Sequence, residues 1–224
     1  MHLRTPAIIA TAAALALGAT ACGSDESSSS SGASSGSGSS EQAKPVADIP
    51  SLSGKSTAVA LDPGFVDALT KLKLTPSPLG DATISEQGVA SFPITGGNVK
   101  YFKPGSVSPF VQGEIDHAGS GLQLKGGGKT VQLTDFVVDP GKSVLTGKVT
   151  VNGSEAAASA PLFFLDGRTL KPLEVNDNGT AVLEGTTVKF KDESAQLLNK
   201  TFGVDALKGG LEVGVAKITI NTSA

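Results

Sequence analysis

The chain has 224 residues, a formal net charge of −3, 28 glycines, one tyrosine and no tryptophan. Acidic and basic residues are interspersed without a basic patch, which argues against nucleic acid as a partner. The only cysteine is Cys22, so an internal disulfide framework is excluded.

The first 21 residues carry the pattern of a secretory signal peptide. Arg4 precedes a short apolar run from Ala7 to Leu17, and small residues follow directly before Cys22. This run is shorter than the ~20 apolar residues that a membrane-spanning helix needs. The pattern leaves two alternatives, an ordinary secretory signal or the signal of a lipoprotein.

The stretch Leu17-Gly18-Ala19-Thr20-Ala21-Cys22 resembles the bacterial lipobox. The resemblance implies cleavage between Ala21 and Cys22 and attachment of diacylglycerol to the Cys22 sulfur. Two or three acyl chains hold a protein firmly at a bilayer. We therefore expect a lipid anchor at Cys22, with the membrane as a partner and the extracytoplasmic face of the cell membrane as the location.

A Ser/Gly-rich tether is expected to follow the anchor. Ser24 to Glu41 contains no apolar residue larger than alanine, so it cannot bury enough surface to offset its ordering entropy. The remainder suits one domain in length. The expected division is a signal peptide over 1–21, the lipidated cysteine with a disordered tether over 22–52, and a single β-domain over 53–224.

Short β-rich runs alternate with turn signals through this domain. Expected strands are 57–61, 82–84, 90–94, 99–102, 112–117, 121–125, 130–138, 143–151, 156–165, 169–175, 180–190 and 211–220. Expected hairpin turns are Gly96-Gly97, Gly126-Gly127-Gly128, Asn152-Gly153, Asp166-Gly167 and Asn178-Gly179. The pattern predicts an all-β, mainly antiparallel fold, either a β-sandwich or a partly open barrel.

Two short helices are expected within the β pattern. Asp62-Pro63 is a helix start followed by an apolar stripe to about Lys73. Asp192-Glu193 starts a second helix, and Gly203 is the expected stop.

Few residues are suited to catalysis. A Ser-His-Asp arrangement needs a histidine beside the nucleophile, and His117 is the only histidine after the expected cleavage point. Zinc would need several His, Cys or carboxylate ligands together. We therefore expect no enzyme, no catalytic residue, no metal site and no cofactor, with haem as the one alternative.

His117 and Tyr101 are the candidate ligand-binding residues. His117 lies in a glycine-flanked strand corner between Gly113 and Leu122, and Tyr101 lies one expected strand earlier. Tyr and His on neighbouring strands could ligate haem iron through the tyrosine. The alternative is that His117 ends a strand and makes local hydrogen bonds.

The run from Gly113 through His117, Gly119 and Leu122 is similar to the Gly-His-x-Gly-x-Leu signature of the HtaA-type domain of actinobacterial haem-uptake proteins. Further similarity is found at Thr134–Asp139, Leu145–Val149, the expected terminal helix and Leu211–Ile220. Three segments, 92–97, 113–122 and 199–213, together also look like a set of uncharacterised secreted actinobacterial β-proteins.

The resemblance implies a β-sandwich with short helices, and haem bound by a tyrosine with a hydrogen-bonding histidine. His117 is the position that carries over, whereas Tyr101 does not sit in the family's tyrosine motif, and its tryptophan-containing opening is missing. The expected function is a non-enzymatic binding or envelope-associated module at the cell surface, with a protein, cell-wall or small-molecule partner. The alternative is carriage of haem or another small ligand.

Overall fold

One large antiparallel sheet organises residues 43–222, the part of the chain that this computed structural model describes. Its 13 strands are β1 (Ala47–Ile49), β2 (Lys55–Leu61), β3 (Thr75–Gly80), β4 (Thr83–Ile84), β5 (Val89–Pro93), β6 (Gly96–Tyr101), β7 (Val111–Gly126), β8 (Lys129–Asp139), β9 (Val144–Val151), β10 (Ser154–Asp166), β11 (Glu174–Asn176), β12 (Thr180–Phe190) and β13 (Glu212–Asn221). The expected anchor at Cys22, the expected signal peptide and most of the expected tether lie outside the described residues.

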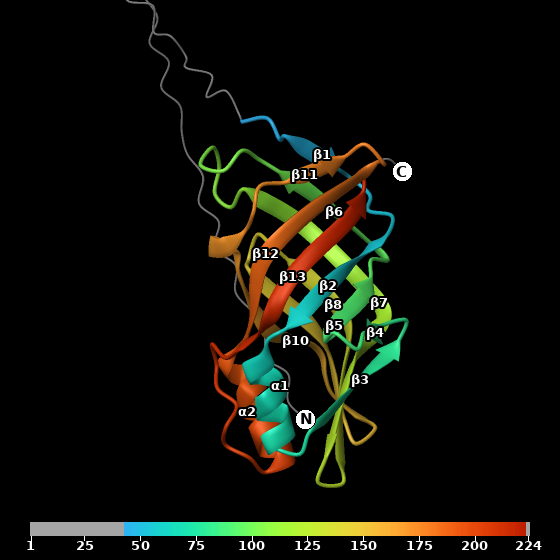
Figure 1. The fold of residues 1–224 in the computed structure, drawn as a ribbon, viewed down its shortest axis with the longest axis vertical. Helices are drawn as coiled ribbons and strands as arrows, with labels where there is room; N and C mark the ends of the chain where they lie inside the picture. Colours follow the sequence, from blue (N-terminus) through green and yellow to red (C-terminus); the bar gives the residue numbers. More distant parts are fainter. Residues whose placement is uncertain (1–42, 223–224) are drawn as a thin grey trace, which may run out of the picture. The chain divides into compact units, whose positions relative to one another are not determined.

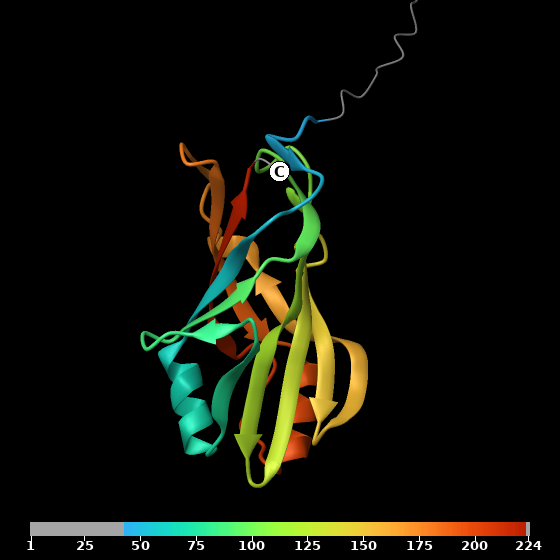
Figure 2. The same ribbon diagram turned by 90° about the vertical axis from the view of Figure 1, so that its right-hand side faces the viewer.

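The sheet curls into an open half-barrel. Its strand order is β1-β6-β7-β8-β9-β10-β12-β13-β2-β5-β4, with β3 on β7 and β11 on β12. The curl brings β5 against β7, although several strands separate them in this order. Figures 1 and 2 show the two walls that result, one with β2, β12 and β13 and the other with β7 and β8. The predicted antiparallel β class is confirmed, in its partly open barrel form.

Apolar alternation and turn residues account for most of the strands. Buried and exposed positions alternate along β8 and β12, which places one face of each strand inward. The predicted turns at Gly127-Gly128, Asn152-Gly153 and Asn178-Gly179 join β7–β8, β9–β10 and β11–β12.

Two predicted hairpin turns are wrong. Gly96 and Gly97 lie within β6, where Gly96 pairs with Asp116 of β7. Asp166 ends β10 and caps a short 3₁₀ helix, Gly167–Thr169, because its carboxylate accepts a hydrogen bond from the Arg168 amide. The local capping bond replaces the tight reversal that Asp-Gly predicts.

Both predicted helices are confirmed, and both lie at one end of the sheet (Figure 1). Helix α1 (Pro63–Lys71) starts after Asp62, whose carboxylate accepts a hydrogen bond from the Phe65 amide at 3.1 Å. Helix α2 (Asp192–Phe202) ends at Gly203, whose left-handed φ of 70° favours glycine. Their buried stripes pack against the hydrophobic core that also fills this end of the curl.

The folded unit begins earlier than residue 53, the boundary expected from the sequence. Strand β1 pairs with β6, and Leu52 is 4% exposed. Val46, Ile49 and Leu52 repeat an apolar residue every third position, so this segment lacks the strict alternation that predicts a strand. Residues 47–52 therefore belong to the domain and not to the tether.

Three further strand predictions need correction. Strand β3 was not expected because it contains Pro76 and Pro78, which fit here since it is an outer strand on β7. The two strands expected over 112–125 are one continuous strand, β7, with a bulge. The strand expected over 169–175 is mostly irregular, and only β11 at its end pairs.

Within residues 43–222, neither helix has the length and apolar character required to cross a bilayer.

Candidate functional site

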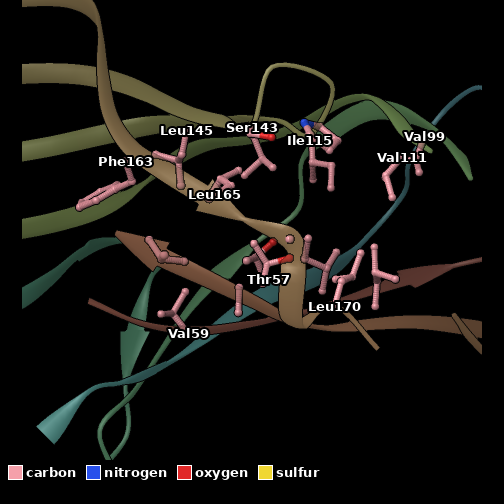
Figure 3. A pocket seen from close by; sticks show the side chains of 18 of the residues that line it. Thr57, Val59, Val99, Val111, Ile115, Ser143, Leu145, Phe163, Leu165 and Leu170 are labelled. Carbon is pink, nitrogen blue, oxygen red and sulfur yellow. The ribbon is translucent and has the colours of Figure 1, made fainter. Parts of the chain in front are cut away.

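A cavity of about 580 Å³ lies inside the curl of the sheet. One wall carries Ile115, Leu145 and Leu165, and the facing wall carries Thr57 and Val59 (Figure 3). The lining is overwhelmingly apolar, because the inward positions of both walls carry Val, Leu, Ile, Ala and Phe. A cavity of this size falls in the range of ~300–1,000 Å³ that small-molecule sites occupy.

Small side chains on the inner face keep the interior hollow. Ala90, Ala181 and Ala216 are buried and line the cavity from β5, β12 and β13. Leu183 and Ile218 also line it, yet they are only partly buried. Partial exposure of inward-facing apolar residues means that the cavity communicates with solvent.

Six exposed or half-buried lining residues in the connections between strands define what we call the mouth. It consists of Ser108 and Pro109 before β7, Pro140 and Ser143 between β8 and β9, and Gly167 and Arg168 after β10. After Leu165, the chain leaves the wall of β9 and crosses to the facing wall, where Leu170 lies (Figure 3).

A bulge in β7 turns His117 into the interior. His117 pairs with Phe136 and Gly121 pairs with Thr134, so three residues of β7 oppose the single residue Asp135. The Asp135 carboxylate accepts a hydrogen bond from the Gly119 amide at 2.9 Å and stabilises the bulge. Bulges re-aim side chains in this manner.

Both ring nitrogens of His117 are engaged. Nε2 lies 2.8 Å from the Thr57 hydroxyl on β2, and Nδ1 lies 3.3 Å from the Phe136 carbonyl oxygen on β8. A tautomer that donates from Nδ1 to Phe136 and accepts at Nε2 from Thr57 satisfies all of these groups. Burial lowers the pKa of His117, which is 2% exposed, and favours this neutral form.

Tyr101 lies at the end of β6 and also lines the cavity. It is 6% exposed, and its ring packs edge-on against Phe110 at 5.9 Å between centroids. Tyr101 therefore helps to close the interior beside the loop that leads into β7.

The structure places both candidate residues in one cavity without bringing them together. Tyr101 pairs with Val111, and His117 lies six residues further along β7. At ~3.3 Å per residue, this separates their backbones by about 20 Å along the strand. A haem-ligating tyrosine with a histidine hydrogen-bonded to it needs the two in contact, so these residues do not fit that arrangement.

A charged cluster at the mouth was not anticipated from the sequence. Asp166 is 5% exposed, and it accepts hydrogen bonds from Arg168 Nε at 2.8 Å and from Lys189 Nζ at 2.9 Å. These bonds hold the pKa of Asp166 well below its usual range. Sequence signals for the cluster are absent, because Lys189 joins it only through the pairing of β10 with β12.

Metal ligation has no support from residue clustering. Among residues 43–222, no three His, Cys, Asp or Glu side chains gather in a way that could hold a metal ion.

The fold and cavity define a curled antiparallel half-barrel with an apolar interior. No family model and no curated protein matches the chain. Among solved structures, the C-terminal domain of HtaA from Corynebacterium glutamicum shares this fold, with a TM-score of 0.52 and 12% identity over 78% of this chain and 98% of that one. A domain-swapped dimer of a histidine-to-alanine variant of that domain gives a TM-score of 0.44 at 12% identity, covering 70% of this chain and 90% of that one. The expected HtaA-like relationship is thus confirmed, as a remote likeness of fold.

Proposed function

We propose that this protein is a non-enzymatic binding module, anchored by a lipid on Cys22 at the outer face of the cell membrane, that holds a small apolar molecule in its cavity. The cavity of about 580 Å³ carries the proposal. If these inward positions served only stability, larger side chains would fill the space, because protein interiors are close-packed.

The chemistry of the lining supports binding over catalysis. Asp166 and Arg168 are the only charged side chains that line the cavity within the described part of the chain, and they are paired with each other. Burial lowers the pKa of His117 and favours its neutral form, and the ring is already hydrogen-bonded on both nitrogens. No side chain in the apolar interior is thus poised to transfer a proton, which fits a carrier.

Filling the cavity tests the proposal. Ala216 faces inward and lines the cavity, whereas its neighbour Val215 is 36% exposed and does not. We expect Ala216→Phe to weaken binding of a neutral apolar fluorophore such as N-phenylnaphthylamine by tenfold or more. Val215→Phe is the matched control and should bind like the parent.

Thermal melts of both variants check that the fold persists, and Ala181→Leu provides a milder filling on β12 if Ala216→Phe melts early. Parent protein that leaves the fluorophore unbound, or filling variants that bind as the parent does, would contradict cavity binding.

Haem is the second candidate, favoured by the fold shared with the HtaA domain and by the size of the cavity. Titration with haemin tests it. A Soret shift that disappears in Tyr101→Phe or His117→Ala would support haem carriage, and an unchanged haemin spectrum would remove it.

A further inference from the structure

The mouth and the interior of the cavity differ in chemistry. Apart from the mouth, the polar side chains in the lining are Thr57, Tyr101, His117, Thr186 and the paired Asp166. Thr57 and His117 bond to each other. Within residues 43–222, no buried side-chain nitrogen or oxygen lacks a hydrogen-bond partner. A charged or strongly polar group placed deep in the cavity would therefore lose its water without replacement.

Strand lengths indicate a long interior. On β13, the inward residues that line the cavity run from Val213 to Ile220. Seven steps at ~3.4 Å per residue span about 24 Å. An interior that is long and apolar suits an extended hydrocarbon chain better than a compact ring system.

Arg168 places a cation beside this apolar interior. Two of its hydrogen bonds go to Asp166, from Nε and from Nη2, and the side chain is 83% exposed. Because a guanidinium has five N–H donors, three remain for a ligand. Lys189 also bonds to Asp166, so the three side chains together carry one net positive charge.

The path of the chain holds Arg168 at the mouth. The Leu165 amide donates to the Ser143 carbonyl at 2.9 Å, which is the last bond between β10 and the turn before β9. The Thr169 hydroxyl then donates to the Gly185 carbonyl at 2.6 Å on β12. Arg168 is therefore fixed between two anchored residues, and its guanidinium is oriented by the Asp166 carboxylate.

We infer that the ligand is a single-chain amphiphile with an anionic head group, its hydrocarbon chain in the cavity and its carboxylate or phosphate head at Arg168. The inference rests on the proposed function, because it names the ligand class of the same cavity. A guanidinium prefers carboxylate and phosphate oxygens, which its forked donors can bind in pairs.

Three ligands with the same chain and different heads test the inference. Myristate, tetradecanol and tetradecyltrimethylammonium are titrated calorimetrically into the chain from Gly23 to Ala224, which contains the whole compact unit. We expect myristate to bind about tenfold more tightly than tetradecanol, as a charge-assisted hydrogen bond provides. Tetradecyltrimethylammonium should bind most weakly, because its head repels Arg168.

Variants locate the head group. Arg168→Gln should remove the preference for myristate and leave tetradecanol binding unchanged, and Arg168→Lys should retain part of it. Lys171→Gln is the matched control, since Lys171 forms a similar exposed pair with Glu184 but does not line the cavity. Dodecyl phosphate compared with laurate then distinguishes a phosphate head from a carboxylate head.

The outcomes separate this inference from the proposed function. Equal binding of myristate and tetradecanol, or a preference that survives in Arg168→Gln, overturns the anionic head while cavity binding stands. If none of the three ligands binds and Ala216→Phe leaves binding of the fluorophore unchanged, both the anionic head group and cavity binding are overturned. If Arg168→Gln melts early, the comparison of head groups on the parent protein serves as the test, because it needs no substitution.

Discussion

His117 joins two parts of the sheet that the strand order keeps apart. Its Nε2 reaches Thr57 on β2, and its Nδ1 reaches Phe136 on the strand beside its own. The ring also packs edge-on against Phe92 of β5 at 6.4 Å between centroids. These contacts cross the open side of the curl, so His117 stabilises its closure. The alternative expected from the sequence, a histidine that ends a strand and bonds locally, is wrong: His117 lies within β7, and its partner Thr57 is 60 residues away in the chain.

His117 predicts a pH dependence of stability. Its folded pKa is lowered, so the folded protein keeps it neutral while the unfolded chain takes up a proton near pH ~6.5. The stability from the neutral histidine is therefore complete above pH ~6.5 and is lost as pH falls toward the folded pKa. Urea unfolding between pH 7 and 5 should show a decline of up to ~1.4 kcal/mol per pH unit.

Substitution of His117 provides the control for this slope. The variant His117→Gln should be less stable at pH 7 by about 1–3 kcal/mol, because Thr57 and Phe136 lose a well-placed partner. Its free energy of unfolding should then stay nearly flat between pH 6.5 and 5. A variant with the same slope as the parent would assign the pH dependence to other groups.

At the scale of elements, β9 packs closely against its neighbours β8 and β10 at Gly147. An ideal Cβ on Gly147 would lie 2.8 Å from Phe136 Cδ1 and 2.9 Å from Leu162 Cδ1. Both of these side chains are buried and have little room to move. A side chain at position 147 would therefore push against Phe136, whose carbonyl oxygen bonds to His117.

The variant Gly147→Ala tests this packing. We expect a loss of about 1–3 kcal/mol in the free energy of unfolding, as overpacking of a filled core produces. Gly167→Ala is the control, because its Cβ would have no neighbour within 4 Å. Equal melting temperatures for the two variants would show that Phe136 and Leu162 can move aside without loss of stability.

Elements with strong local signals could be predicted from the sequence, and those set by pairing could not. Asp62-Pro63 and Gly203 fixed the helix ends because capping is a local interaction. Strand β3 could not be predicted because it contains prolines, and proline is tolerated in an outer strand that pairs on one side only. Whether a strand is an outer one depends on the arrangement of the whole sheet.

The candidate site shows the same division. His117 was singled out as the only histidine of the expected mature chain, but its place in the cavity wall depends on the bulge opposite Asp135. The cavity itself arises from small residues on strands far apart in the sequence, such as Ala90 and Ala216. Arg168 could not be recognised from the sequence as a residue at a cavity, because a cavity depends on the total volume of many side chains.

At the scale of the whole molecule, the shared fold and the cavity chemistry carry different information. The likeness to the HtaA domain spans 98% of that domain at 12% identity, so the curled sheet tolerates almost complete replacement of its residues. Function then rests on the particular side chains that face inward. In this chain they form an apolar interior with one cationic mouth, and not a tyrosine and histidine in contact.

A lipid at Cys22 would set where this cavity works. Growth with an alkyne-tagged palmitate should label the parent protein, and the mature protein should begin at Cys22 with added acyl mass. Cys22→Ser should lose the label, because the serine hydroxyl cannot replace the sulfur that receives the diacylglycerol. Ser34→Ala is the control in the same Ser/Gly-rich segment and should be labelled as the parent is. Label retained by Cys22→Ser, or a parent whose mature end lies elsewhere without acyl mass, would exclude the anchor and leave the cavity to a freely secreted carrier.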